Sequence, residues 1–200
     1  GTANGSFRVE AYRAPDFEVV VTPTDKDAFV AARAKVQLSG QYLFGAPMAG
    51  AKISWTAYRR SRDFSPAGWT DWAFGKQADR FWWYDYNEQT NVHAGGEESQ
   101  LSSAGTLDLD LELAASDELD GPQELVIEAE VTDVNRQVVS GRSTVRVHPG
   151  SYYVGIKSPG YMVKAGDKLE TAITAVTPEG ASVAGRAVTV ELQRRTWQSI

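Results

Sequence analysis

The sequence predicts an all-β protein built as an antiparallel β-sandwich. Apolar and polar residues alternate in many short runs, Gly, Pro, Asn or Asp bounds each run, and no segment carries apolar residues at helical spacing over three turns. Alternation with a period of two directs one face of a strand toward a core and the other toward water. Many short strands separated by turn residues are typical of two antiparallel sheets packed together.

The clearest predicted strand covers residues 107–113, where leucines alternate strictly with Asp108, Asp110 and Glu112. Grouped carboxylates can bind calcium or catalyse glycoside hydrolysis. The alternation instead places these three on the solvent face of one strand. The other predicted strands share this pattern and cover residues 17–21, 36–42, 53–58, 125–131 and 145–147.

An internal repeat relates two parts of the chain. Residues 45–61 (GAPMAGAKISWTAYRRS) align without gaps with residues 180–196 (GASVAGRAVTVELQRRT), an offset of 180 − 45 = 135. The same offset places the run 17–21 on residues 152–156. Each copy is predicted to be a hairpin, in which a glycine-containing turn joins two strands. Residues 131–147 show a similar hairpin pattern and are expected to close the first sandwich.

The offset also sets the expected domain boundaries. Residues 1–13 are interpreted as the last strand or linker of a preceding domain, and residues 14–148 as one β-sandwich with an aromatic-rich insertion near 61–105. Residues 149–200 then form the first part of a second domain. Because this last segment is much shorter than one repeat, we expect the chain to end within its second domain, leaving sheet edges unpaired.

Composition excludes several functions. The formal net charge of −6 argues against a nucleic-acid partner, which requires a basic face to neutralise phosphates. No run approaches the ~18 apolar residues of a membrane span, so no membrane contact is expected of this piece. The chain has no cysteine, which excludes disulfides, thiolate metal sites and cysteine nucleophiles.

No catalytic, cofactor-binding or metal-binding residues are predicted, and no cofactor is expected. His93 and His148 are the only histidines, and neither stands at a metal-ligand spacing. His93 is expected at a loop tip, and His148, which precedes Pro149, is expected to form a structural hydrogen bond at the domain junction. A serine nucleophile is rejected because no G-x-S-x-G turn is present.

Three segments resemble the alpha-2-macroglobulin family. Residues 7–19 (FRVEAYRAPDFEV) resemble the junction between successive macroglobulin-like domains, and residues 148–156 (HPGSYYVGI) resemble the next junction. Residues 42–51 (YLFGAPMAGA) resemble the family's Y-x-F/Y-G-x-P-V-x-G-A hairpin. The Trp-rich stretch after Tyr58 is more similar to the bacterial branch. The resemblance covers nearly the whole chain and implies two consecutive macroglobulin-like domains, the second incomplete, with a fibronectin- or immunoglobulin-like sandwich architecture.

Members of this family trap proteases, and many carry a thioester that requires a Cys-x-x-Gln type of motif. The resemblance therefore implies a scaffold fragment of a bacterial protease inhibitor, located in the periplasm or cell envelope. Its partners would be neighbouring domains of the same parent chain and, through the parent, target proteases. Since the chain lacks cysteine, this piece contains no thioester.

The segment Phe81–Tyr86 suggests the main alternative function. On an extended strand, Trp82, Tyr84 and Tyr86 share one face, where they could stack on sugar rings as a carbohydrate- or cell-wall-binding module. Two structural explanations compete with this one: the aromatic insertion could pack over the sandwich, or it could contact a neighbouring domain, since Trp and Tyr are enriched at interfaces. A generic surface or adhesin repeat is the third interpretation of the chain as a whole.

Overall fold

A computed structural model describes residues 14–75, 90–119, 121–158, 160, 164, 166–192 and 196. Eleven strands and no helix occur in these residues, which confirms the all-β prediction. The chain divides into two compact units. Unit 1 combines Gly1–Arg62 with Tyr86–Pro149, and unit 2 combines Asp63–Asp85 with Gly150–Ile200.

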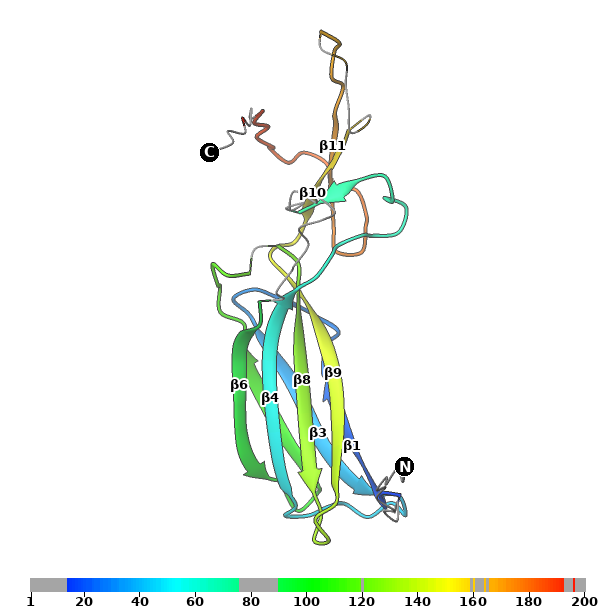
Figure 1. Ribbon diagram of the computed structural model, residues 1–200, viewed down its shortest axis with the longest axis vertical. Helices are drawn as coiled ribbons and strands as arrows, with labels where there is room; N and C mark the ends of the chain where they lie inside the picture. The colour runs from blue at the N-terminus through cyan, green and yellow to red at the C-terminus, as the bar shows by residue number, and fades with distance from the viewer. Residues whose placement is uncertain are drawn as a thin grey trace, which may run out of the picture. The chain divides into compact units, whose positions relative to one another are not determined.

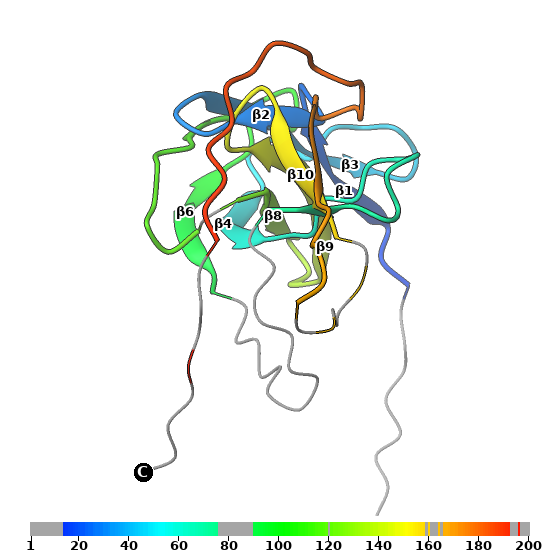
Figure 2. The same ribbon diagram turned by 90° about the horizontal axis from the view of Figure 1, so that it is seen from above.

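Unit 1 is a sandwich of two sheets. The first sheet has the order β1–β3–β7 and consists of β1 (Phe17–Pro23), β3 (Arg33–Tyr42) and β7 (Thr106–Glu112). The second has the order β2–β9–β8–β4–β6 and consists of β2 (Asp27–Phe29), β9 (Val138–His148), β8 (Gln123–Thr132), β4 (Lys52–Ser61) and β6 (Val92–Gln100). Figure 1 shows β6, β4, β8 and β9 side by side, and Figure 2 places β1 and β3 opposite β4 and β6.

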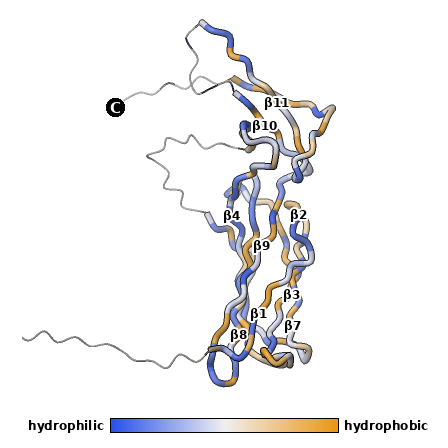
Figure 3. The backbone as a smooth tube through the Cα atoms, turned by 90° about the vertical axis from the view of Figure 1, so that its right-hand side faces the viewer, coloured by the Kyte–Doolittle hydropathy of each residue, from blue (hydrophilic) through white to orange (hydrophobic). Residues whose placement is uncertain are grey.

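Strand pairing in unit 1 is antiparallel with one exception, since β2 runs parallel to the end of β9. Alternate residues of the long strands are buried between the sheets. Hydrophobic and hydrophilic residues occur in turn along their backbone tubes (Figure 3). Leu38, Ile127 and Val131 are fully buried in this core. The antiparallel sandwich predicted from the period-two pattern is therefore confirmed.

The acidic residues of β7 face solvent, as predicted. Asp108 accepts a hydrogen bond from Gln37 at 3.0 Å, and Asp110 accepts one from Arg33 at 2.8 Å. Both pairs join β7 to its neighbour β3 on the outside of the sandwich. These carboxylates therefore act in cross-strand pairing on a hydrated face.

The predicted hairpin at residues 45–61 is wrong in its return strand. The turn itself is tight, with a bridge between Gln41 and Pro47. After the turn the chain crosses to the other sheet, because β4 pairs with β6 and β8 while β3 pairs with β1 and β7. The apolar side chains of β4 thus enter the core from the opposite side. The second predicted hairpin is correct, since β8 and β9 pair along their whole length.

Residues 61–105, expected as an insertion in the first sandwich, contribute to both units. Strand β6 pairs with β4 at the edge of the five-stranded sheet of unit 1. Residues 63–75 belong to unit 2 and contain strand β5 (Ala73–Phe74). Every residue of β6 is exposed or partly exposed, so the sequence of this edge strand lacks the apolar alternation that marks the other strands.

Unit 2 contains a three-stranded antiparallel sheet. Its order is β11–β10–β5, with β10 at Tyr153–Lys157 and β11 at Ala172–Val176. Strand β5 pairs with the edge of β10 at two positions, Phe74 with Gly155 and Ala73 with Ile156. This sheet is therefore assembled from two stretches of sequence that lie far apart in the chain.

The strand pair β10–β11 repeats the register of β1–β3. Glu18 faces Gln41 in unit 1, and Tyr153 faces Val176 in unit 2, so both partners are displaced by 135 residues (153 − 18 and 176 − 41). The remaining four pairs of β10 and β11 obey the same offset. The sequence repeat is therefore also a repeat of strand pairing.

The turn after each strand pair is repeated as well. In unit 1 the amide of Met48 donates to the carbonyl oxygen of Gly40 at 3.0 Å, and in unit 2 the amide of Val183 donates to that of Ala175 at 2.8 Å. Gly45 and Gly180, which occupy the same turn position, have φ angles of +96° and +89°. This left-handed conformation favours glycine, which explains why both copies retain it.

Candidate interaction site

The predicted aromatic strip of Trp82, Tyr84 and Tyr86 lies outside the described residues. The neighbouring aromatic side chains, at residues 64–74, are described and belong to unit 2. They form the most extensive aromatic cluster among the described residues, and they are the candidate interaction site of this chain. We call residues 63–75 the aromatic segment.

The aromatic segment packs on strands β10 and β11. The ring of Phe64 stacks on that of Tyr153 with 3.8 Å between centroids, and it meets the ring of Phe74 edge-on at 5.3 Å. Trp69 contacts Phe74 edge-on at 6.3 Å. Together with Trp72 these rings bury Tyr153, which is 5% exposed, and Val176, which is fully buried. Stacked and edge-on aromatic pairs of this kind each contribute about 0.5–1.5 kcal/mol beyond the burial of their surface.

Two polar contacts fix the orientation of the aromatic segment. The indole N–H of Trp69 donates to the carbonyl oxygen of Gly180 at 2.9 Å. The ammonium of Lys157 lies 3.1 Å from the carboxylate of Asp71, and both side chains are substantially exposed. The indole bond is directional and specific, whereas the exposed ion pair adds at most about 1 kcal/mol.

The opposite face of the β10–β11 pair is apolar and open. Val154, Ile156 and Ile173 are 41%, 47% and 39% exposed. Their counterparts at the offset of 135 are Val19, Val21 and Leu38, which are 9%, 7% and 0% exposed in the core of unit 1. The face that forms the core in the first copy is thus uncovered in the second.

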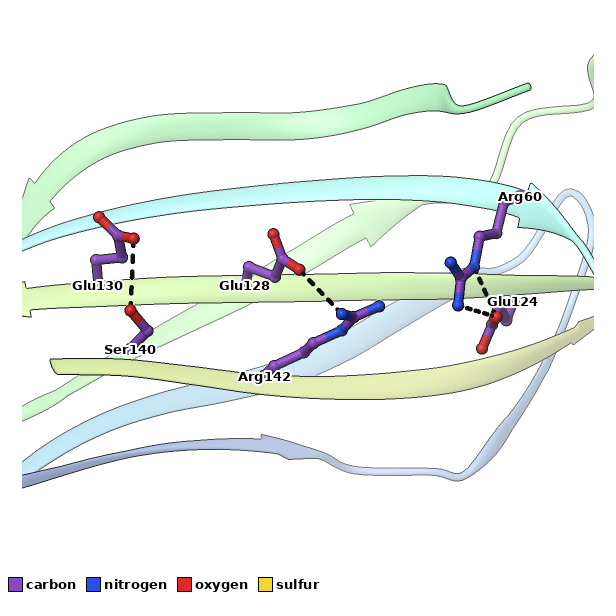
Figure 4. A network of polar contacts seen from close by, with 6 residues as sticks. All are labelled: Arg60, Glu124, Glu128, Glu130, Ser140 and Arg142. Carbon is purple, nitrogen blue, oxygen red and sulfur yellow. Dashed lines mark hydrogen bonds and ion pairs between the residues drawn. The ribbon is translucent and has the colours of Figure 1, made fainter. Parts of the chain in front are cut away.

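Charged side chains on the outer face of the five-stranded sheet form cross-strand pairs (Figure 4). Arg60 on β4 contacts Glu124 on β8 at 2.6 Å, and Arg142 on β9 contacts Glu128 at 3.5 Å. A weaker hydrogen bond of 3.4 Å joins Ser140 to Glu130. Each pair stands opposite its partner in the sheet register, so the network stabilises strand pairing.

The two histidines occupy strands. His93 lies in β6 opposite Tyr58, so its expected position at a loop tip is wrong. His148 ends β9, is 5% exposed and places Nε2 3.0 Å from Oδ1 of Asp27. The structural hydrogen bond expected for His148 is therefore present.

Asp27 also lies 2.6 Å from the guanidinium of Arg146. Partial burial acts to raise the pKa of Asp27, but hydrogen bonds to His148 and Arg146 outweigh it and hold that pKa below its usual value. This cluster joins β2 to β9.

Sequence reasoning missed a buried cation at Arg59. Its side chain lies on the core-facing side of β4, in line with Trp55 and Ala57, and it is 3% exposed. One guanidinium nitrogen donates to Oε1 of Gln123 at 3.2 Å, and Nε has no hydrogen-bond partner among the described residues. Burial lowers the pKa of Arg59. The period-two pattern could have predicted this burial, because Arg59 continues the series of core-facing positions Ile53, Trp55 and Ala57.

Within the described ranges, no group of three or more His, Asp or Glu side chains is placed to hold a metal ion. None of the residues that the structure describes lies in a helix that could cross a membrane. Apart from the pair of Lys157 and Asp71, the charged contacts described above join neighbouring strands.

The fold defines an all-β sandwich whose opening strand pair and turn recur 135 residues further along the chain. Comparison with known proteins identifies the family. Residues 17–149 match the bacterial alpha-2-macroglobulin MG5 domain. The chain belongs to the bacterial alpha-2-macroglobulin family.

Similar proteins include an alpha-2-macroglobulin homolog of Nostoc sp., which is 24% identical over 98% of this chain and 10% of its own length. The native conformation of Escherichia coli alpha-2-macroglobulin superimposes with a TM-score of 0.62 at 16% identity, over 88% of this chain and 12% of that one. A Salmonella alpha-2-macroglobulin variant gives the same values. The chain thus spans about a tenth of the length of these relatives.

Proposed function

We propose that this chain is a structural scaffold piece of a bacterial protease inhibitor of the alpha-2-macroglobulin type, with no catalysis of its own. The observation that carries the proposal is the match of residues 17–149 to the MG5 domain of that family. The parent protein would reside in the periplasm or cell envelope and engage proteases through other parts. The role of this piece is to hold neighbouring domains of the same chain in position.

We further propose that residues 14–148 carry one macroglobulin-like domain and residues 149–200 the first part of a second, to whose sheet the aromatic segment of residues 63–75 also contributes. The identical register of β1–β3 and β10–β11 supports this division. So does the open face at Val154, Ile156 and Ile173, which has the composition of a sandwich core. Residues 1–13, which the sequence pattern assigned to a preceding domain, lie outside the described residues.

The protease-trap role is tested on the full-length parent. Parent protein and a protease are mixed, and cleavage of a large protein substrate is compared with cleavage of a small peptide. A trap blocks the large substrate and spares the small one, whereas the isolated 200-residue chain should affect neither. A parent that leaves cleavage of both substrates unchanged at stoichiometric excess would exclude the proposal.

The alternative, carbohydrate binding through Trp82, Tyr84 and Tyr86, makes a different prediction. Stacking of sugar rings on these side chains would quench tryptophan fluorescence on titration with glycans or cell-wall polymer. The scaffold proposal expects no quenching. Saturable quenching that disappears in Trp82→Ala would favour the binding module.

A further inference from the structure

The outer surfaces of the two repeated strand pairs differ in chemistry. In unit 1 the face of β1–β3 that points away from the core carries Glu18 and Gln41, and both are exposed. The residues at the same register positions in unit 2 are Tyr153 and Val176, and both are buried. Two exposed polar side chains of unit 1 thus correspond to two buried side chains of unit 2, although the two strand pairs have the same register.

The third difference is steric. Val20 in β1 corresponds to Gly155 in β10, because 20 + 135 = 155. A Cβ atom at residue 155 would lie 2.5 Å from Cε1 and 2.8 Å from Cζ of Phe74, closer than carbon atoms can approach. Only glycine at this position leaves room for the Phe74 ring, so β10 has the shape needed to receive it.

The backbone of β10 also takes part in this contact. Strand β5 adds to the free edge of β10, so the aromatic segment contributes main-chain hydrogen bonds as well as rings. Addition of a strand to an exposed sheet edge combines affinity from the main chain with specificity from side-chain pockets. Here the pocket is the space above Gly155, next to Tyr153.

We propose that the face of β10–β11 formed by Tyr153, Gly155 and Val176 is an acceptor site for the aromatic segment. Unit 2 is then a fold that requires a segment encoded between two strands of unit 1. The peptide bond between Pro149 and Gly150 is consequently not a boundary between two independent folding units. This inference goes beyond the protease-trap role and does not depend on it.

The test cuts the chain at this boundary. A recognition sequence for a site-specific protease is inserted after Pro149 in the full 200-residue chain, and the cut protein is analysed by size-exclusion chromatography at micromolar concentration. We expect the C-terminal piece to remain bound, because the aromatic segment is part of the N-terminal piece. Release of the C-terminal piece from the cut wild-type chain would overturn the proposal.

The variant Gly155→Val places in β10 the residue that β1 has at this register position, and it should release the C-terminal piece after cutting. The matched control is Gly160→Val, because a Cβ atom at residue 160 meets no atom within 4 Å. In the uncut chain, amide hydrogen exchange should be faster in residues 73–74 and 153–157 of Gly155→Val and unchanged in the control. Wild-type exchange and retention in Gly155→Val would contradict the proposal.

A milder variant keeps the test decisive if Gly155→Val unfolds the whole chain. Trp69→Phe removes the hydrogen bond to Gly180 and retains an aromatic ring. We expect about a tenfold faster dissociation of the cut pieces, with amide exchange in β8 of unit 1 unaffected. Dissociation at the wild-type rate would show that the aromatic segment does not hold the C-terminal piece.

Discussion

Asp27 and His148 join the first strand of the five-stranded sheet to the end of its parallel neighbour. Oδ1 of Asp27 lies 3.0 Å from Nε2 of His148, while Oδ2 lies 2.6 Å from Arg146. The histidine is nearly buried, whereas the carboxylate is 40% exposed. The pair thus fixes the only parallel contact of unit 1 among the described strands.

This contact predicts acid sensitivity. Because the pKa of Asp27 is lowered in the folded state, the ionised carboxylate stabilises the fold at pH values above its unfolded pKa of about 3.9. That contribution is lost as the pH falls through the lower folded pKa. We expect Asp27→Asn to destabilise the protein at neutral pH by up to about 1 kcal/mol, since the carboxylate is partly exposed. The difference from wild type should vanish at low pH.

Urea unfolding between pH 3 and pH 7 measures this effect, with exposed Asp117→Asn as the control. A difference between Asp27→Asn and wild type that stays constant across this range would show that the carboxylate is not stabilised by its neighbours.

The repeated register predicts unequal effects of equivalent substitutions. Leu38 is fully buried in unit 1, while Ile173, its counterpart at the offset of 135, is 39% exposed. Leu38→Ala removes packed atoms and leaves a cavity, so we expect a loss of about 2–5 kcal/mol in unfolding free energy. Ile173→Ala should cost less than about 1 kcal/mol in the same chain. Thermal and urea denaturation measure the loss in unfolding free energy for each variant. Equal losses would contradict the exposure of Ile173 on the open face of β10–β11.

The buried pair of Arg59 and Gln123 predicts non-additive energetics. Replacing Gln123 with Met removes the one described acceptor of a buried guanidinium, and we expect a cost of about 1–3 kcal/mol. Arg59→Met should also destabilise, because Gln123 loses its donor. The double variant should be more stable than the sum of the two single effects implies. A double-mutant cycle by urea unfolding measures the coupling, and strict additivity would show that the two side chains do not interact.

The open apolar face predicts self-association. Val154, Ile156 and Ile173 expose hydrophobic surface on one side of a short sheet, and such surfaces drive contacts between molecules. We expect the 200-residue chain to associate reversibly as its concentration rises in sedimentation velocity experiments, and Ile156→Ser to weaken that association. Ile156→Ser should leave the stability of unit 1 unchanged. A chain that stays monomeric at every concentration would contradict this expectation.

The period-two pattern predicted most of the strands of unit 1, because their alternating apolar residues are buried between two sheets. Strand β6 was not predicted, since an edge strand that pairs with one neighbour and has no fully buried side chain needs no alternation of apolar and polar residues. The hairpin at residues 45–61 was misread for a related reason. A turn with Gly45 looks the same in sequence whether the next strand pairs with the previous one or crosses to the facing sheet.

The candidate site was less predictable than the fold. Sequence reasoning recognised the aromatic-rich insertion and allowed for contact with a neighbouring domain. The residues that it chose, Trp82, Tyr84 and Tyr86, lie outside the described residues and stay a prediction. The described contacts are made by the earlier rings, at residues 64–74. Their partners Tyr153 and Val176 follow the first sandwich in the sequence. Contacts between segments this far apart produce no local sequence pattern from which they could be predicted.

The sequence distance between β5 and β10 has a consequence during protein synthesis. Phe74 emerges from the ribosome 155 − 74 = 81 residues before Gly155, its partner in the sheet. At ~5–20 residues per second the ring of Phe74 stays without its partner strand for roughly 4–16 s, and the rings of Phe64 and Trp69 for slightly longer. Nascent chains of this protein therefore pass through a stage at which a chaperone has an aromatic segment to bind, and that stage ends when β10 leaves the exit tunnel.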